Sequence, residues 1–342
     1  MPSFGRSVDR VVGGLSRLLH LRGAQLNTVD DLGPYLDAAR AVMFPQPVVP
    51  RDVVRKTVRS GERTLERLQW HSAHFPLCPH YRARHAGEYA RNQTATARWM
   101  HPVRGRRNGA LVYVHGWLEP SPWQALFLPR LYDALGVDVL HLQLPFHGTR
   151  NPRSALFHGE FFWTADLVRS IEAVRQACLD ARTLVAWLRA EGYTEVGVAG
   201  ISMGASVAMV LACLDPLPNY IVPIIGHLQL AEAVEDAPIF WRMKADLERF
   251  GVNRQRRQDV FGRLGLQNLT PSLPRDRQLW IMAREDVYIP APLVERQWRS
   301  WGEPAIEWLP GGHMTFALSL PRIVERMREF HDGLGDAPPM GR

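Results

Sequence analysis

The chain has 342 residues, of which 46% are hydrophobic and 22% charged, so it has enough apolar residues to bury a large core, and no apolar run reaches the roughly 18 residues of a membrane-spanning helix. The net charge is +7, but the basic residues are almost all arginine, and no zinc-finger spacing, RNA-recognition signature or dense basic run accompanies them, so we expect no nucleic-acid binding. Three cysteines far apart in the sequence do not resemble a disulfide framework and predict a reducing compartment, the cytoplasm.

Residues 1–26 predict an amphipathic helix, because apolar residues recur at helical spacing with arginines between them. Arg17 interrupts the apolar stretch and no clear cleavage site follows, which argues against a signal peptide. We expect the apolar stripe to pack on the protein's own core. Peripheral contact of this helix with a membrane surface is the alternative.

Residues 28–94 predict further helices, including one from about Asp52 to His71. From Thr94 the hydrophobic period becomes that of strands, and helical stretches separate several of them. The expected strands fall within 94–103, 109–117, 137–148, 195–204, 220–227, 277–286 and 305–313, and the expected helices are 122–135, about 160–191, 203–214 and 290–301. This alternation predicts an α/β fold with a mostly parallel sheet covered on both faces.

Residues 227–275 interrupt the alternation with a helical, arginine-rich segment, which we interpret as a cap over the strand ends. The predicted organisation is therefore a series of five segments. They are a helical N-terminal extension (1–94), a first part of the α/β core (95–226), the cap (227–275), a second part of the core (276–332) and a disordered tail (333–342).

The stretch Gly200-Ile201-Ser202-Met203-Gly204 fits the pattern G-x-S-x-G, between a buried strand and a helix rich in small residues. A serine at such a turn adopts an unfavourable backbone conformation, and the flanking glycines let strand and helix approach each other. Ser202 is therefore the candidate nucleophile.

A serine hydroxyl needs a base, and the base needs a carboxylate that fixes its tautomer. His313 follows a predicted strand and the residues Pro-Gly-Gly, and Asp286 follows the strand before it. Glu285, directly adjacent, is the other candidate for the acid. The amide of Met203 and that of Trp117, in the loop His115-Gly116-Trp117, are the candidate oxyanion donors.

These motifs occur in one order over roughly residues 95–332, and in that order the chain resembles the α/β-hydrolase superfamily, in a poorly characterised branch. The resemblance implies the α/β-hydrolase fold and acyl transfer through a serine ester, usually to water. Ala283 stands where the family often has glycine, and the first 90 or so residues lie outside the common core. One fold hosts esterases, lipases, thioesterases, peptidases and acyltransferases, so the substrate is not implied.

The turn Leu144–Pro152 holds His147 and Arg150 together. It is either a structural turn, in which both side chains satisfy backbone carbonyls, or the edge of a pocket that binds an acidic or phosphate group. In the presumed cap, Trp241 of the sequence PIFW is a packing residue unless it faces the serine, in which case it lines an apolar acyl pocket. His147, Arg150 and Trp241 are thus the candidate substrate-binding residues.

The segment His71–His85 holds four histidines and Cys78, but their spacing matches no usual ligand set and two prolines interrupt it. We expect neither a metal nor a cofactor. The sequence favours a serine hydrolase that cleaves an ester or thioester of a small molecule or lipid with an apolar acyl part. An acyltransferase that uses the same acyl-enzyme and a catalytically silent binding module are the alternatives.

Overall fold

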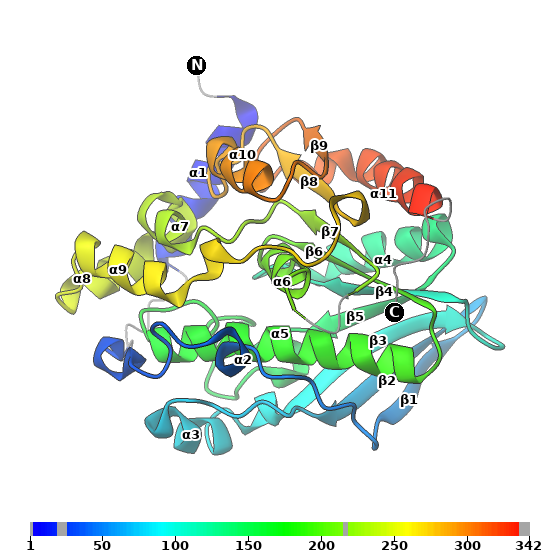
Figure 1. Ribbon diagram of the computed structural model, residues 1–342, viewed down its shortest axis with the longest axis horizontal. Coiled ribbons are helices and arrows are strands. Elements are labelled where there is room, and N and C mark those ends of the chain that lie inside the picture. The colour runs from blue at the N-terminus through cyan, green and yellow to red at the C-terminus, as the bar shows by residue number, and fades with distance from the viewer. Residues whose placement is uncertain (1–2, 19–25, 215–217, 335–342) are drawn as a thin grey trace.

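The computed structural model describes residues 3–18, 26–214 and 218–334. Nine strands form one sheet in the order β1-β2-β3-β5-β4-β6-β7-β8-β9 (Figure 1). Their bounds are β1 Val54–Ser60, β2 Arg63–His71, β3 Thr94–Pro102, β4 Gly109–Val114, β5 Asp138–Gln143, β6 Glu195–Ile201, β7 Tyr220–Ile224, β8 Leu279–Ala283 and β9 Ala305–Leu309. The strands from β4 to β9 are parallel, whereas β1, β2 and β3 are antiparallel to their neighbours.

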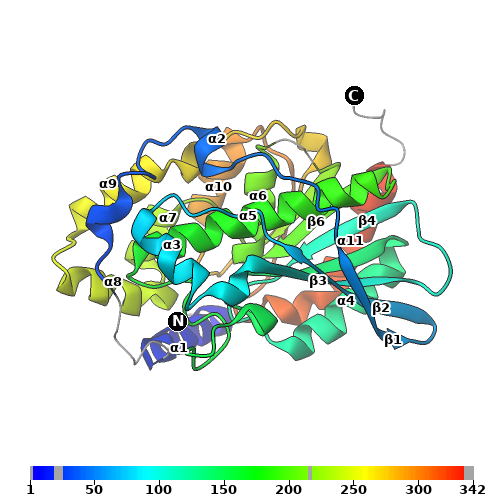
Figure 2. The ribbon, with the colours of Figure 1, turned by 90° about the horizontal axis from the view of Figure 1, so that it is seen from below.

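Helices cover both faces of the sheet, as the alternating sequence predicts. One face packs on α4 (Ser121–Leu135) and α11 (Leu320–Leu334), and the other packs on α5 (Leu167–Ala190), α6 (Met203–Leu211) and α10 (Ala291–Ser300) (Figure 2). Strand β4 is buried along its whole length and alternates between two cores, with Val112 in one and Tyr113 in the other. The mixed α/β class and the mostly parallel sheet are confirmed.

The prediction of a helix from Asp52 to His71, within a helical extension ending at residue 94, is wrong. These residues form the hairpin β1–β2, and β2 pairs with β3 along its whole length, from Arg63 opposite Pro102 to His71 opposite Thr94. The edge strand β1 is exposed on both faces, so its sequence VRKTVRS carries no alternation between buried and exposed residues. Among the described residues of this part of the chain, the α-helices are α1 (Phe4–Leu15), α2 (Arg40–Met43) and α3 (Pro79–Ala86).

The segment 227–275 contains α7 (Leu230–Asp236), η5 (Pro238–Phe240), α8 (Trp241–Arg249) and α9 (Arg254–Leu264). Helices α8 and α9 lie at the end of the molecule opposite the β1–β2 hairpin (Figures 1 and 2). The predicted tail 333–342 lies outside the described residues except for its first two, which end α11. Within the described ranges, we find no helix with the length and apolar character needed to cross a bilayer.

Helix α1 packs differently from the prediction. Its buried residues are Gly5, Asp9 and Gly13, spaced four apart, whereas its large apolar side chains Phe4 and Val11 are exposed to 73% and 63%. Small residues on the inner face let the helix backbone approach its neighbours closely, so Phe4, Val11 and Leu15 are turned outward, whereas Val8 and Val12 are half-buried.

Candidate active site

Ser202 lies at the junction of β6 and α6, with φ 53° and ψ −112°. This is a conformation that a residue with a Cβ rarely adopts. The flanking glycines explain how it is held: a Cβ on Gly200 would collide with the carbonyl of Gly204, and one on Gly204 would collide with the carbonyl of Val114. The turn therefore has the strained geometry that the G-x-S-x-G pattern predicts.

The chain brings His313 and Asp286 to this serine from two other turns. His313 Nε2 lies 3.0 Å from Ser202 Oγ, and His313 Nδ1 lies 2.7 Å from Asp286 Oδ2. The other carboxylate oxygen of Asp286 accepts the amide N–H groups of Tyr288 and Ile289, each at 2.8 Å, which fixes its orientation. Asp286 rather than the half-buried Glu285 is thus the carboxylate bonded to the histidine.

The charges around His313 favour its protonated form. Burial alone would lower the pKa of the imidazole, but the charge of Asp286, its hydrogen bond and the charge of Asp9 together raise it above the ordinary value. A base with a raised pKa holds the proton that it takes from a serine more firmly. The arrangement can therefore move a proton from Ser202 Oγ to His313 Nε2.

The loop after β4 passes directly beside the serine. A Cβ on Gly116 would lie 3.5 Å from Ser202 Cβ, and Trp117 and Met203 line the same cavity as the serine. Glu119 holds this loop, because its Oε2 accepts the N–H of Gly116 and the hydroxyl of Tyr113, each at 2.8 Å. Burial raises the pKa of Glu119 to about 7. The assignment of Met203 and Trp117 as oxyanion donors stays a prediction.

A cavity of about 250 Å³ opens on Ser202 and His313, and it is largely apolar. Helices α1, α5, α6 and α7 and the segment η5 all contribute to its walls. The apolar lining includes Val12, Leu118, Trp163, Val174, Val207, Val210, Leu228, Leu230, Ile239, Phe240, Leu266 and Ile289. Such a cavity suits an extended apolar group whose reactive end reaches the serine.

The three predicted substrate-binding residues are not among the residues that line this cavity. Arg150 is 1% exposed and donates to the carbonyls of Gln143 and Asn92 and to Asp180. The ring of His147 is buried, and its Nδ1 lies 2.8 Å from the carbonyl oxygen of Pro145. His147 thus contacts a carbonyl of the turn, and Arg150 contacts buried groups next to it, an arrangement that agrees with the structural interpretation. A role of these residues in substrate binding stays a prediction. Trp241 begins α8, whereas its neighbours Ile239 and Phe240 line the cavity.

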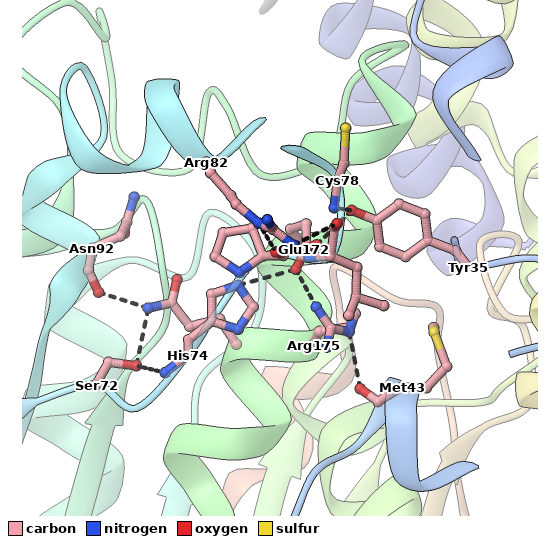
Figure 3. Close-up of polar contacts among 12 residues, drawn as sticks. Tyr35, Met43, Ser72, His74, Cys78, Arg82, Asn92, Glu172 and Arg175 are labelled. Atoms are coloured by element: carbon pink, nitrogen blue, oxygen red, sulfur yellow. Dashed lines mark hydrogen bonds and ion pairs between the residues drawn. The ribbon is translucent and has the colours of Figure 1, made fainter. Parts of the chain in front are cut away.

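The histidine-rich segment lies away from the serine and packs against α5. His74 pairs with the buried Glu172, which also accepts the hydroxyl of Tyr35 and a guanidinium N–H of Arg175 (Figure 3). Burial alone would raise the pKa of Glu172, but the contacts with His74 and then Arg175 lower it to about 2. These contacts connect the N-terminal segment to α5.

Two other side chains of that segment come close to an aspartate that sequence spacing did not connect with them. Asp31, Cys78 and His80 each have one atom of the kind that can ligate a metal, and these three atoms lie within 4.8 Å of one another. His80 Nδ1 is 3.3 Å from Asp31 Oδ1. All three cysteines of the chain are buried and free.

The sequence analysis missed Asp9. Its carboxylate accepts amide N–H groups of His313 and Met314 at 2.8 Å, and of Val287 at 3.2 Å. The spacing of Gly5, Asp9 and Gly13 does place them on one face of this helix, but nothing in the sequence connects that face with His313.

Residues 92–234 match the model of the family "Alpha/beta hydrolase domain containing 18". These residues are similar to an α/β-hydrolase domain, and the chain has the α/β-hydrolase fold. An uncharacterized protein of Mycobacterium tuberculosis is similar to this chain, with 29% identity over 320 residues that cover 86% of this chain and 71% of the relative.

Solved α/β-hydrolase structures share the fold at low sequence identity. The acetyl xylan esterase from Paenibacillus sp. R4 superposes with a TM-score of 0.58 and 14% identity, and the match covers 88% of this chain and 99% of that one. Carboxyl esterase 2 from Tuber melanosporum superposes with a TM-score of 0.52 and 17% identity, covering 89% of this chain and 96% of that one.

Proposed function

We propose that the chain is a serine hydrolase that cleaves a carboxylic ester or thioester with an apolar acyl group. The observation that carries this proposal is the line of contacts from Ser202 Oγ through the imidazole of His313 to Asp286, at 3.0 and 2.7 Å, beside an apolar cavity. The esterases with the same fold support an ester as the bond that is cleaved.

In this mechanism the Ser202 hydroxyl gives its proton to His313 Nε2 as Oγ bonds to the acyl carbon. The carbonyl electron pair moves to the oxygen, where the amides of Met203 and Trp117 would stabilise the negative charge. The intermediate collapses, and the alcohol or thiol leaves with the proton from His313. Water then attacks the acyl-enzyme and gives a proton to His313. The bond between the acyl carbon and Ser202 Oγ breaks, Oγ recovers the proton from His313, and the free acid leaves. Asp286 stabilises the imidazolium in both halves of the reaction.

The test compares native protein with Ser202→Ala, using a fluorophosphonate probe and a series of acyl esters of increasing chain length. Ser300→Ala, a change at the exposed end of α10, is the control. We expect labelling and hydrolysis in the native protein and the control, and a loss of at least about 10³-fold in Ser202→Ala. Equal labelling of all three would disprove the role of Ser202. Product analysis with an added alcohol acceptor separates hydrolysis from acyl transfer.

We also propose that α1 contacts an anionic lipid surface. Phe4, Val11 and Leu15 are exposed on one face of this helix, and Arg6 and Arg10 are exposed elsewhere on its surface. Native protein should sediment with vesicles that contain phosphatidylglycerol, and the triple variant Phe4→Ser, Val11→Ser, Leu15→Ser should not. These substitutions leave the inner face of α1 intact. Native protein that ignores the vesicles contradicts the proposal.

A further inference from the structure

Helix α1 is pressed against the turn that carries His313. A Cβ on Gly5 would collide with the backbone nitrogen of Gly312, and one on Gly13 would collide with the side chain of Pro238. The two glycines therefore bring the helix backbone close to the histidine turn at one end and to η5 at the other. Between them, Asp9 is fully buried.

The carboxylate of Asp9 bridges the two turns that hold the acid and the base. Its Oδ2 accepts N–H from His313 at 2.8 Å and from Val287 at 3.2 Å, and its Oδ1 accepts N–H from Met314 at 2.8 Å. Its backbone carbonyl accepts the hydroxyl of Tyr288 at 2.8 Å. One residue of α1 thus fixes the backbone next to Asp286 and the backbone of His313 itself.

We propose that Asp9 is a positioning residue, which holds the turns of Asp286 and His313 at the spacing that proton transfer needs. This inference rests on the proposed function, and it adds a second carboxylate, after Asp286, to the surroundings of His313. Asp9 touches neither the serine nor the imidazole ring in this arrangement; it acts through the backbone of both turns and through its charge.

The electrostatics agree with this geometry. Both oxygens of Asp9 accept N–H groups, which suits a carboxylate rather than a carboxylic acid. Burial raises the pKa of Asp9 despite these hydrogen bonds, and its charge contributes to the raised pKa of His313. Removing the charge therefore lowers the pKa of His313, so the imidazole becomes a free base at a lower pH.

The experiment measures the second-order rate constant of fluorophosphonate labelling between about pH 5 and 9. The variants are Asp9→Asn, which removes the charge, and Asp9→Glu, which keeps it but lengthens the side chain. Asp166→Asn is the matched control, because Asp166 is also fully buried and accepts N–H groups, but at the start of α5. Near-ultraviolet circular dichroism establishes that each variant is folded.

In Asp9→Asn we expect a plateau about 10- to 100-fold lower, because the reacting groups are displaced, and an acid limb moved to lower pH. In Asp9→Glu we expect a lowered plateau with the limb near its native position. Asp166→Asn should lose stability without moving the limb. A native plateau and a native limb in Asp9→Asn, or in Asp9→Glu if the first variant does not fold, would overturn the inference. Loss of Ser202-dependent labelling in the native protein would instead contradict the proposed function.

Discussion

Two neighbouring strands of the sheet, β4 and β5, are each followed by a turn that contains His-Gly, and the side chains of the two turns lie in different places. The turn after β4 brings Trp117 to the cavity, whereas the turn after β5 directs Arg150 into the protein interior. The histidines of the two turns, His115 and His147, are both buried. Their rings contact each other, with centroids 4.8 Å apart. The motif alone does not decide which turn meets the substrate.

The position of each strand in the sheet decides it. Strand β4 pairs with β6, so its turn lies beside the serine that follows β6. Strand β5 pairs on its other side with the antiparallel β3, whose beginning lies at the carboxyl end of β5. Asn92, just before β3, accepts the N–H of Phe146 and a guanidinium N–H of Arg150. Asn92 thus bonds this turn to the N-terminal part of the chain, and no residue of Leu144–Pro152 lines the cavity.

The largest effect that would sharpen this comparison is expected for Arg150→Met. The change leaves the buried carboxylate of Asp180 without its guanidinium partner, so the free energy of unfolding should fall by about 3–5 kcal/mol. Urea denaturation measures the loss, and fluorophosphonate labelling per folded molecule should stay native. The opposite pattern, native stability with lost labelling, would indicate that Arg150 binds the substrate.

A smaller effect concerns three buried histidines, His115 and His147 in the two turns and His141 in β5. Burial lowers the pKa of His115 to about 4 and also lowers the pKa values of His141 and His147. Each therefore takes a proton more readily in the unfolded chain, and the stability that each contributes is complete above about pH 6.5 and is lost as the pH falls toward the folded pKa. His141 makes no hydrogen bond through either ring nitrogen to the described residues.

His141→Leu should consequently be close to native in stability at pH 7 and lose less stability in acid. Below about pH 6.5, a histidine of this kind lowers the free energy of unfolding by up to about 1.4 kcal/mol per pH unit. The free energy of unfolding of the variant should therefore exceed that of the native protein by about 2 kcal/mol at pH 5. Urea denaturation at both pH values measures the difference. A variant that loses as much as the native protein between pH 7 and 5 would show that His141 is not one of the groups that titrate on unfolding.

The sequence allowed the strands from β3 to β9 and the contacts of Ser202, Asp286 and His313 to be predicted, because each lies in a local pattern of strand, turn and small residues. Three features had no such pattern. Strand β1 is exposed on both faces, the direction of Arg150 depends on Asn92, and Asp9 meets His313 across 304 residues of chain. Contacts of that separation are set by packing, which a window of sequence does not contain.

The smallest expected effect compares two adjacent residues of the segment 227–275. Phe240 lines the cavity and packs edge-to-face on Trp163 at 5.7 Å, whereas Trp241 begins α8 and is not a lining residue. Phe240→Ala enlarges this cavity, so under the proposed function it should shift kcat/KM toward longer or bulkier acyl esters by about threefold to tenfold, or roughly 1 kcal/mol. Trp241→Ala, the matched control, should keep the native order of preference across the chain-length series. A shift in Trp241→Ala with none in Phe240→Ala would mean that the acyl group lies along α8 rather than in this cavity.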